Sequence, residues 1–314
     1  MAIGHATLVQ QPAQVFDPVC RQPGIDSLPG QAMEAANSHR LLRLLAVALL
    51  LAAGSFCAAA TPAPVRPQLR VLFVGNSLIY TNNLPGLLRA LAEAQPNGPR
   101  IATETYVAPG GTVAERWEDG KVAAALASGG WDAIVLQERG GMLACMADND
   151  LRQHPQCRAS ERAHTDFAEL AATHGTRTLL LATWGLDQTA QHQMDRALRR
   201  LASRIEPGDA AATVVPAGST LRLFASRHSW LGTFPDGIHP STQASLIMAA
   251  QLYRALTGRD AQAVDVVIDF PLLPVNALIK PDVALEHQPQ IGGDGRLLLI
   301  KADTVAPLLR AATP

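Results

Sequence analysis

The 314-residue chain has almost no net charge, few aromatic residues and only four cysteines. Its 26 basic and 27 acidic residues leave a net charge of −1, so the composition indicates neither nucleic acid nor an acidic membrane surface as a partner. Aromatic residues make up 4% of the chain, which argues against an extended sugar-stacking surface but not against a compact acetyl pocket. The sequence has no internal repeat, which excludes a repeat architecture.

The chain also lacks an apolar run of roughly 20 residues, the length that spans a membrane comfortably. The N-terminal run LLAVALLLAAG follows a basic patch at residues 39–43 and precedes a small-residue stretch that ends at residues 58–60. This order is typical of a cleaved secretory signal. We therefore expect export to the periplasm or the extracellular space, with no stable membrane span after cleavage. A permanent anchor is the alternative, whereas the bulky Phe56 disfavours lipidation of Cys57.

These features divide the chain into four predicted parts. Residues 1–60 form a presequence, and Met33 is a candidate for its true start because the preceding residues have no signal character. Residues 61–68 are rich in proline and alanine and form a short linker. Residues 69–258 form one α/β domain, and residues 259–314 exceed what that domain needs. We expect this extension to add strand or hairpin material packed on the domain.

Two of the four cysteines remain after removal of the presequence, Cys145 and Cys157, and both are placed in a polar loop. An oxidising compartment favours a disulfide between them, which would close a loop of about a dozen residues and contribute about 2–3 kcal/mol. Two unpaired thiols are the alternative. A metal site is disfavoured, because only His154 lies nearby and the spacing matches no zinc pattern.

Apolar runs of strand length alternate with helical patterns along the main domain. This alternation predicts a mostly parallel sheet with helices on both faces. Ligands bind such sheets at the carboxyl ends of the strands, where the strand order switches. The expected strands are residues 69–75, 101–107, 133–137, 177–183 and 213–216, and the expected helices are residues 84–94, 113–127, 160–174, 188–205 and 241–256.

Three residues in two distant segments have the chemistry of a nucleophilic triad. Ser77 follows the first strand-like run, while Asp236 and His239 lie three residues apart just before a helix. A serine attacks only when an imidazole takes its proton and a carboxylate orients that imidazole. An isolated serine is also a common helix cap, and an isolated D-x-x-H is often a plain turn. Together the three residues predict a serine hydrolase, with Ser77 as nucleophile, His239 as general base and Asp236 as its orienting partner.

Acyl transfer also needs hydrogen-bond donors for the developing oxyanion. The backbone N–H of Ser77 is one candidate. The turn at Gly110 and Gly111 is a second, because glycines allow a close approach of the backbone to a substrate. A plain glycine turn is the alternative interpretation. The loop after the third strand, which begins at Gln137, is expected to supply a third donor.

The segments FVGNSLIYTNNLP and DGIHP resemble the first and last sequence blocks of the GDSL-type, or SGNH, hydrolases. Gly110 and Gly111 fall where the second block of that family supplies its oxyanion glycine. The resemblance covers most of residues 69–256 and implies a flavodoxin-like three-layer α/β/α sandwich, with the triad roles given above. The third block departs from the common G-x-N-D form, because this chain has LQERGG there. Related branches carry an L-Q-x segment there, so the departure leaves the family assignment in place, and Gln137, in the loop of residues 137–140, is the candidate for the third donor.

Asn76, Tyr80 and Trp184 are candidates for the substrate pocket, although a core or rim aromatic is an alternative role for Trp184. The predicted function is that of a secreted serine esterase which hydrolyses carboxylic esters, for example on acetylated glycans, and needs neither a metal nor an organic cofactor. Two alternatives remain open. One is an acyltransferase with the same triad, and the other is a non-catalytic glycan-binding protein of the same fold.

Overall fold

Five parallel strands form the central sheet in the computed structural model, which describes residues 66–205, 212–289 and 297–313. The strand order is β2-β1-β3-β4-β5, which is the flavodoxin-like order. The predicted α/β class with a parallel sheet is therefore confirmed. The strands are β1 (Gln68–Gly75), β2 (Arg100–Val107), β3 (Ala133–Leu136), β4 (Arg177–Leu181) and β5 (Thr213–Val215).

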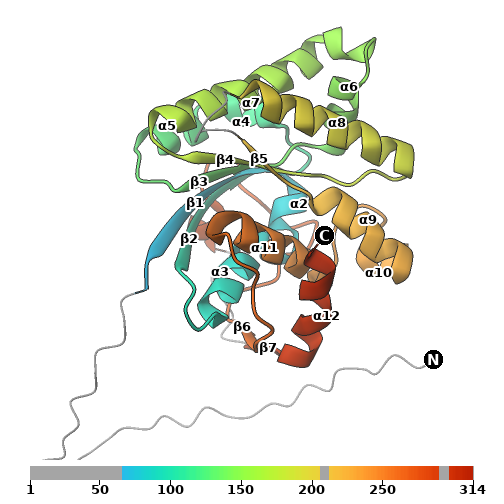
Figure 1. The fold of residues 1–314 in the computed structure, drawn as a ribbon. Coiled ribbons are helices and arrows are strands. Elements are labelled where there is room, and N and C mark those ends of the chain that lie inside the picture. Colours follow the sequence, from blue (N-terminus) through green and yellow to red (C-terminus); the bar gives the residue numbers. More distant parts are fainter. Residues whose placement is uncertain (1–65, 206–211, 290–296, 314) are drawn as a thin grey trace, which may run out of the picture. The chain divides into compact units, whose positions relative to one another are not determined.

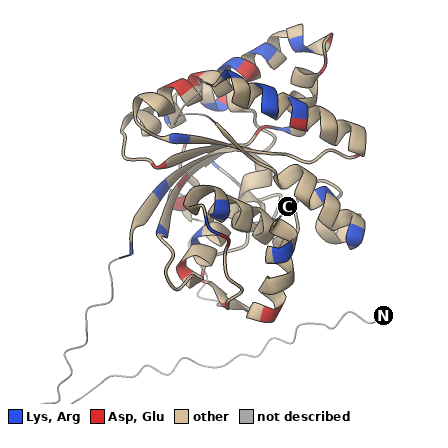
Figure 2. Ribbon diagram, in the orientation of Figure 1, with Lys and Arg blue, Asp and Glu red and all other residues tan. Residues whose placement is uncertain are grey.

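Helices cover both faces of this sheet and make a three-layer α/β/α arrangement (Figure 1). One face carries α4 (Val113–Glu118), α5 (Lys121–Ala127), α6 (Gly140–Ala147), α7 (Pro155–Thr173) and α8 (Gln188–Arg204). The other face carries α2 (Ser77–Tyr80), α3 (Leu84–Ala94), α9 (Ala217–Arg227), α10 (Trp230–Thr233) and α11 (Thr242–Thr257). The helices α7 and α8 carry charged residues of both signs (Figure 2).

The strand β1 lies between β2 and β3, and its side chains alternate between the two layers of helices. Val71 and Phe73 belong to the apolar core beneath α3 and α11, whereas Leu72 and Val74 belong to the core beneath α4 and α7. All four side chains are fully buried. A continuous apolar run is what a strand covered on both faces requires, which explains why the sequence predicted this strand well.

The predicted helix over residues 113–127 is wrong in one respect, because the structure divides it into α4 and α5. Gly120 separates the two helices and has a left-handed backbone with φ of +70°, a conformation that a side chain other than glycine rarely adopts. Both helices pack against α7.

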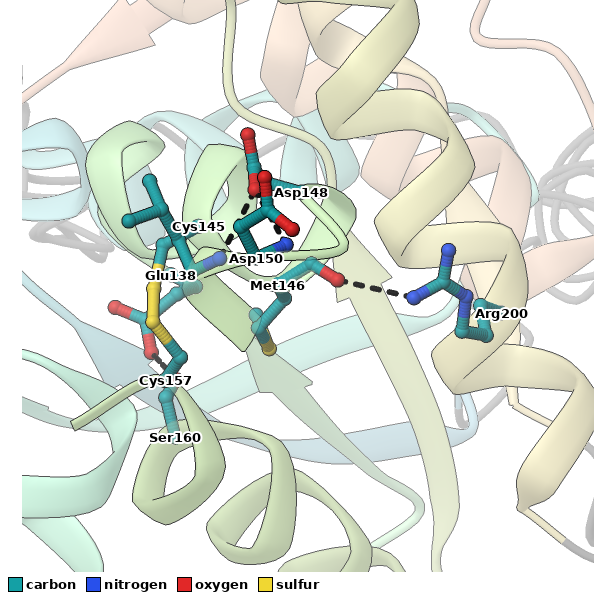
Figure 3. The surroundings of a disulfide bond; sticks show 9 residues. Glu138, Cys145, Met146, Asp148, Asp150, Cys157, Ser160 and Arg200 are labelled. Carbon is teal, nitrogen blue, oxygen red and sulfur yellow. Dashed lines mark hydrogen bonds between the residues drawn. A yellow bond between two sulfur atoms is a disulfide. The ribbon is translucent and has the colours of Figure 1, made fainter. Parts of the chain in front are cut away.

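The prediction of a polar loop around the two cysteines is also wrong, because Cys145 lies in α6 and Cys157 in α7. The helix α6 begins with two glycines, which have a low helix propensity, so the sequence pattern does not predict a helix there. The predicted disulfide is present and joins the two helices across a Cα–Cα distance of 6.0 Å (Figure 3). Arg200 of α8 donates a hydrogen bond of 3.0 Å to the backbone oxygen of Met146, so α6 is tied to both neighbouring helices.

The last 56 residues of the chain add a small antiparallel strand pair and a helix. The strands are β6 (Val266–Ile268) and β7 (Leu298–Ile300), and the 3-10 turn η3 (Leu285–His287) lies between them along the chain. The helix α12 (Ala302–Ala312), which the sequence did not predict, packs against α11 through buried Val305 and Leu308.

The predicted presequence, residues 1–60, and residues 61–65 of the predicted linker lie outside the described residues. Throughout residues 66–205, 212–289 and 297–313, each helix is too short or too polar to traverse a lipid bilayer.

Candidate active site

The turn from β1 into α2 presents Ser77 at the carboxyl edge of the sheet. A Cβ atom on Gly75 would lie 2.8 Å from both Gln137 Oε1 and Ile79 Cγ1, so this turn requires glycine. Asn76 caps α2, because its Oδ1 accepts a hydrogen bond of 3.1 Å from the N–H of Leu78. Ser77 is the first residue of the helix, and its own N–H has no acceptor among the residues that the structure describes.

A chain of two hydrogen bonds joins Ser77, His239 and Asp236. The Ser77 Oγ lies 2.9 Å from His239 Nε2, and His239 Nδ1 lies 2.6 Å from Asp236 Oδ2. A carboxylate only accepts hydrogen bonds, so the Nδ1 atom carries the ring proton and Nε2 is left to accept the proton of the serine hydroxyl. The sequence predicts that Ser77, His239 and Asp236 act together because of their chemistry. In the structure they have the arrangement of a nucleophile, a base and an orienting group.

The Asp236 carboxylate keeps its charge to low pH. Partial burial raises its pKa, but hydrogen bonds from the backbone N–H groups of His239 and Ile238 and from the His239 ring outweigh this effect. The pKa falls from 3.8 to about 2. Asp236 is therefore ionised at any pH at which the imidazole needs a partner.

Two tryptophans hold the backbone between Asp236 and His239. The Trp184 Nε1–H donates to the backbone oxygen of Ile238 at 2.8 Å, and the Trp230 Nε1–H donates to that of Gly237 at 3.2 Å. Gly237 has a φ of +88°, which lets the chain fold back so that the carboxylate meets the imidazole.

The turn at Gly110 lines the same cavity as Ser77. Gly110 has a φ of +65° and lines the cavity described below, and its N–H has no acceptor among the described residues. The N–H of Gly111 is occupied, because it donates to the oxygen of Ala108 at 3.1 Å. The Gly111 oxygen in turn accepts a hydrogen bond of 3.1 Å from Asn76 Nδ2, which ties this turn to the start of α2. Of the two predicted glycines, Gly110 is thus the one with an available donor.

The structure does not bring the side chain of Gln137 into the site. Its Oε1 accepts the N–H of Asn76 at 3.3 Å, and its Nε2 donates to the oxygen of Glu138 at 2.7 Å and to Thr183 Oγ1 at 3.1 Å. The side chain is 1% exposed. Its contacts hold Asn76, the residue before Ser77, and no side-chain donor of Gln137 is left for an oxyanion.

A cavity of about 530 Å³ opens next to the triad. Its polar end includes Ser77, Gly110 and His239, and its wall is mostly apolar. The cavity contains Trp184 and Asn76, as predicted for the pocket, but not Tyr80, which is 1% exposed and donates its hydroxyl to the oxygen of Val275 at 2.7 Å. The remaining lining residues are Leu78, Arg139, Gly140, Gly141, Thr183, Leu186, Asp187, Ala190, Met194 and Ile238. Of these, only Arg139 and Gly140 belong to the loop of residues 137–140 in which the sequence predicts an oxyanion donor.

The signal for these two residues, and for Gly141 beside them, is their position along the chain. Arg139, Gly140 and Gly141 directly follow the third strand, where the sheet topology places ligand contacts. Within the described part of the chain, no group of three histidine, cysteine, aspartate or glutamate side chains is arranged to hold a metal ion.

No protein-family model matches the chain, and no curated protein matches it. Among solved structures, a protein from Slackia heliotrinireducens, provisionally described as an SGNH hydrolase, is 22% identical, with 60% of this chain and 98% of that chain covered and a TM-score of 0.46. A catalytic mutant of an acetylxylan esterase from Geobacillus stearothermophilus is 14% identical, with coverages of 61% and 95% and a TM-score of 0.47. A protein from Parabacteroides merdae, provisionally described as a GDSL-like lipase, is 13% identical, with coverages of 62% and 97% and a TM-score of 0.46. Similarities this low assign no activity to this chain.

Proposed function

We propose that this chain is a serine esterase that hydrolyses carboxylic esters through an acyl-enzyme on Ser77. The observation that carries the proposal is the hydrogen-bonded series from Ser77 Oγ through His239 to Asp236, at the polar end of a cavity. A serine with an adjacent base and an ordered carboxylate is the standard means of acyl transfer without a cofactor.

In the proposed mechanism, the Ser77 oxygen attacks the ester carbonyl while His239 Nε2 takes the hydroxyl proton. The oxyanion of the tetrahedral intermediate accepts hydrogen bonds from the N–H groups of Ser77 and Gly110. His239 then gives its proton to the leaving alcohol, and the acyl-enzyme forms. Water enters, loses a proton to His239 and releases the acid by the same route.

The proposed substrates are esters of small acyl groups, including acetyl esters of glycans outside the cytoplasm. The cavity of about 530 Å³ leaves room for an acyl group together with part of the alcohol. Its wall of Leu78, Trp184, Leu186 and Met194 favours apolar parts of the substrate next to the reacting carbonyl. Export, which would give access to such glycans, stays a proposal that rests on the signal pattern of residues 1–60.

The test is the release of p-nitrophenol from acetyl through octanoyl esters by the purified protein. Ser77→Ala should lower kcat by about 10⁴-fold or more, as removal of a triad nucleophile does elsewhere. Ser203→Ala, which changes an exposed serine on α8, is the matched control and should keep full activity. A wild-type protein as inactive as Ser77→Ala on every ester would overturn the proposal. Addition of sugar acceptors to the assay would then separate an acyltransferase from a binding protein.

A further inference from the structure

The carboxylate of Glu138 is buried beside the candidate active site and takes no part in the mechanism above. The residue is 1% exposed and is absent from the lining of the cavity. Its Oε2 accepts the N–H of Val113 at 3.1 Å and the hydroxyl proton of Ser160, and its Oε1 accepts the N–H of Arg139 at 2.7 Å. Figure 3 shows the contact with Ser160 next to the disulfide. All three partners are donors, which suits a group that can only accept.

The partners of Glu138 belong to the segments on either side of Gly110. Val113 is the first residue of α4 and follows the Gly110 turn by three positions. Arg139 precedes α6, and its Nη1 lies 3.4 Å from the backbone oxygen of Gly110. Ser160 belongs to α7, which the disulfide joins to α6. One carboxylate therefore connects the chain that follows the candidate oxyanion donor with Arg139, which contacts the backbone oxygen of Gly110.

Burying a carboxylate in the core of a protein is energetically unfavourable unless its oxygens are hydrogen-bonded. Removing an ionised group from water is unfavourable, and the hydrogen bonds that a buried carboxylate accepts largely serve to offset this cost. The value of Glu138 is thus better sought in geometry than in stability. Its two N–H contacts fix the start of α4 and the start of α6 at a set separation.

We infer that Glu138 is a positioning residue for the oxyanion site: it orients the Gly110 N–H by anchoring Val113 and Arg139. The inference rests on the proposed esterase function. Oxyanion donors act at 2.7–3.1 Å from the position of the charged oxygen. A small displacement of the turn therefore reduces the stabilisation that the Gly110 N–H gives to the transition state. The ground-state ester lacks that charge, so its binding changes little. Loss of the anchor should lower kcat and leave KM nearly constant.

The N–H of Val113 can be deleted without touching Glu138. Proline is well tolerated at the first position of a helix, and Thr112 before it has the extended backbone that proline requires, with φ of −109° and ψ of 160°. Val113→Pro therefore removes one donor to the carboxylate, whereas Val113→Ala keeps the N–H and reports the loss of the valine side chain alone. Glu138→Gln is the second test, because it keeps the size of the side chain. Its amide N–H₂ would face at least one of the three groups that donate to Glu138, so at least one of these hydrogen bonds is lost.

The experiment measures kcat and KM on p-nitrophenyl acetate, and inhibition by an aryl trifluoromethyl ketone. Ser77 adds to this ketone and gives up its proton to His239, so the resulting hemiketal oxyanion occupies the same donors. We expect kcat to fall about tenfold in Val113→Pro and Glu138→Gln, with the inhibition constant rising in parallel and KM within about twofold. Val113→Ala should show a clearly smaller effect.

Folded Val113→Pro and Glu138→Gln proteins with wild-type kcat and wild-type inhibition would overturn the inference, as would a loss in Val113→Ala equal to that in Val113→Pro. These results are separate from a failure of the proposed function. In that case the wild-type protein itself would be no more active than Ser77→Ala.

Discussion

Asp236 holds His239 at two points. Its Oδ2 lies 2.6 Å from the ring Nδ1, and its Oδ1 accepts the backbone N–H of the same histidine at 2.7 Å. One carboxylate therefore sets both the position of the backbone and the rotation of the imidazole. The three-residue spacing across Gly237 makes this possible, because the left-handed glycine folds the chain back on itself. Contacts within four consecutive residues thus direct the ring towards Ser77.

Replacement of Asp236 by asparagine should reverse the proton positions on the imidazole. The amide oxygen can still accept the two backbone N–H groups, which leaves the amide N–H₂ facing Nδ1. Nδ1 must then accept, Nε2 carries the proton, and the ring can no longer take the proton of Ser77. We expect kcat on p-nitrophenyl acetate to fall by about 10²–10⁴-fold. An Asp236→Asn protein with unchanged circular dichroism and near wild-type kcat would contradict this role.

The low pKa of Asp236 predicts how stability changes in acid. The folded pKa of about 2 lies below the ordinary value of 3.8, so the ionised carboxylate stabilises the folded state above about pH 4. This contribution disappears as the pH falls through 3.8 towards 2. The side chain is 45% exposed, so the effect is small. Urea unfolding between pH 5 and pH 2 should show wild type losing stability more steeply than Asp236→Asn. Parallel curves would refute the assignment.

Trp184 is expected to affect both binding and catalysis. Its ring lines the cavity and stacks on Phe234 with centroids 5.0 Å apart, and its N–H holds the oxygen of Ile238, the residue before His239. Trp184→Phe leaves that oxygen without its donor, which should cost about 1 kcal/mol of stability and change kcat and KM together. Trp230→Phe removes the similar bond to Gly237 from outside the cavity. It should lower kcat and leave KM unchanged, and equal KM shifts in both variants would contradict the distinction.

The disulfide should contribute to stability more than to catalysis. Replacing Cys145 and Cys157 together by alanine opens a loop with a sequence separation of 12 and should lower the free energy of unfolding by about 3 kcal/mol. Urea titration of the double variant, beside wild type with and without reductant, measures this change. Reduced wild type should approach the double variant, whereas no shift on reduction would show that the bond is absent in solution.

Much of the fold follows from local patterns in the sequence. The bounds of α3 were predicted without error, because its apolar residues keep helical spacing and Asn83 caps its start. The buried strands were recognisable as short apolar runs for the same local reason. The helix α6 was missed, since its two initial glycines and its all-round apolar composition give no amphipathic stripe. Its place was set by packing against α7 and α8, which no local pattern encodes.

The candidate site likewise contains residues whose placement the sequence predicts and residues whose placement it does not. Ser77, Asp236 and His239 were predictable, because their chemistry is specific and each follows a recognisable turn. The direction of Gln137 was not, because the choice between the cavity and the core depends on Asn76 and Thr183, which are distant in sequence. Tyr80 was misassigned to the pocket for a related reason. Its hydroxyl meets Val275, 195 residues further along the chain.

The bond between Ser77 and His239 also has a consequence in time. The two residues are 162 positions apart, and ribosomes add about 5–20 residues per second. The serine is therefore made about 8–32 s before the histidine that would activate it. Throughout this interval the growing chain lacks the imidazole that contacts the Ser77 hydroxyl in the folded protein, so the proposed esterase could not act on its surroundings before His239 has been added.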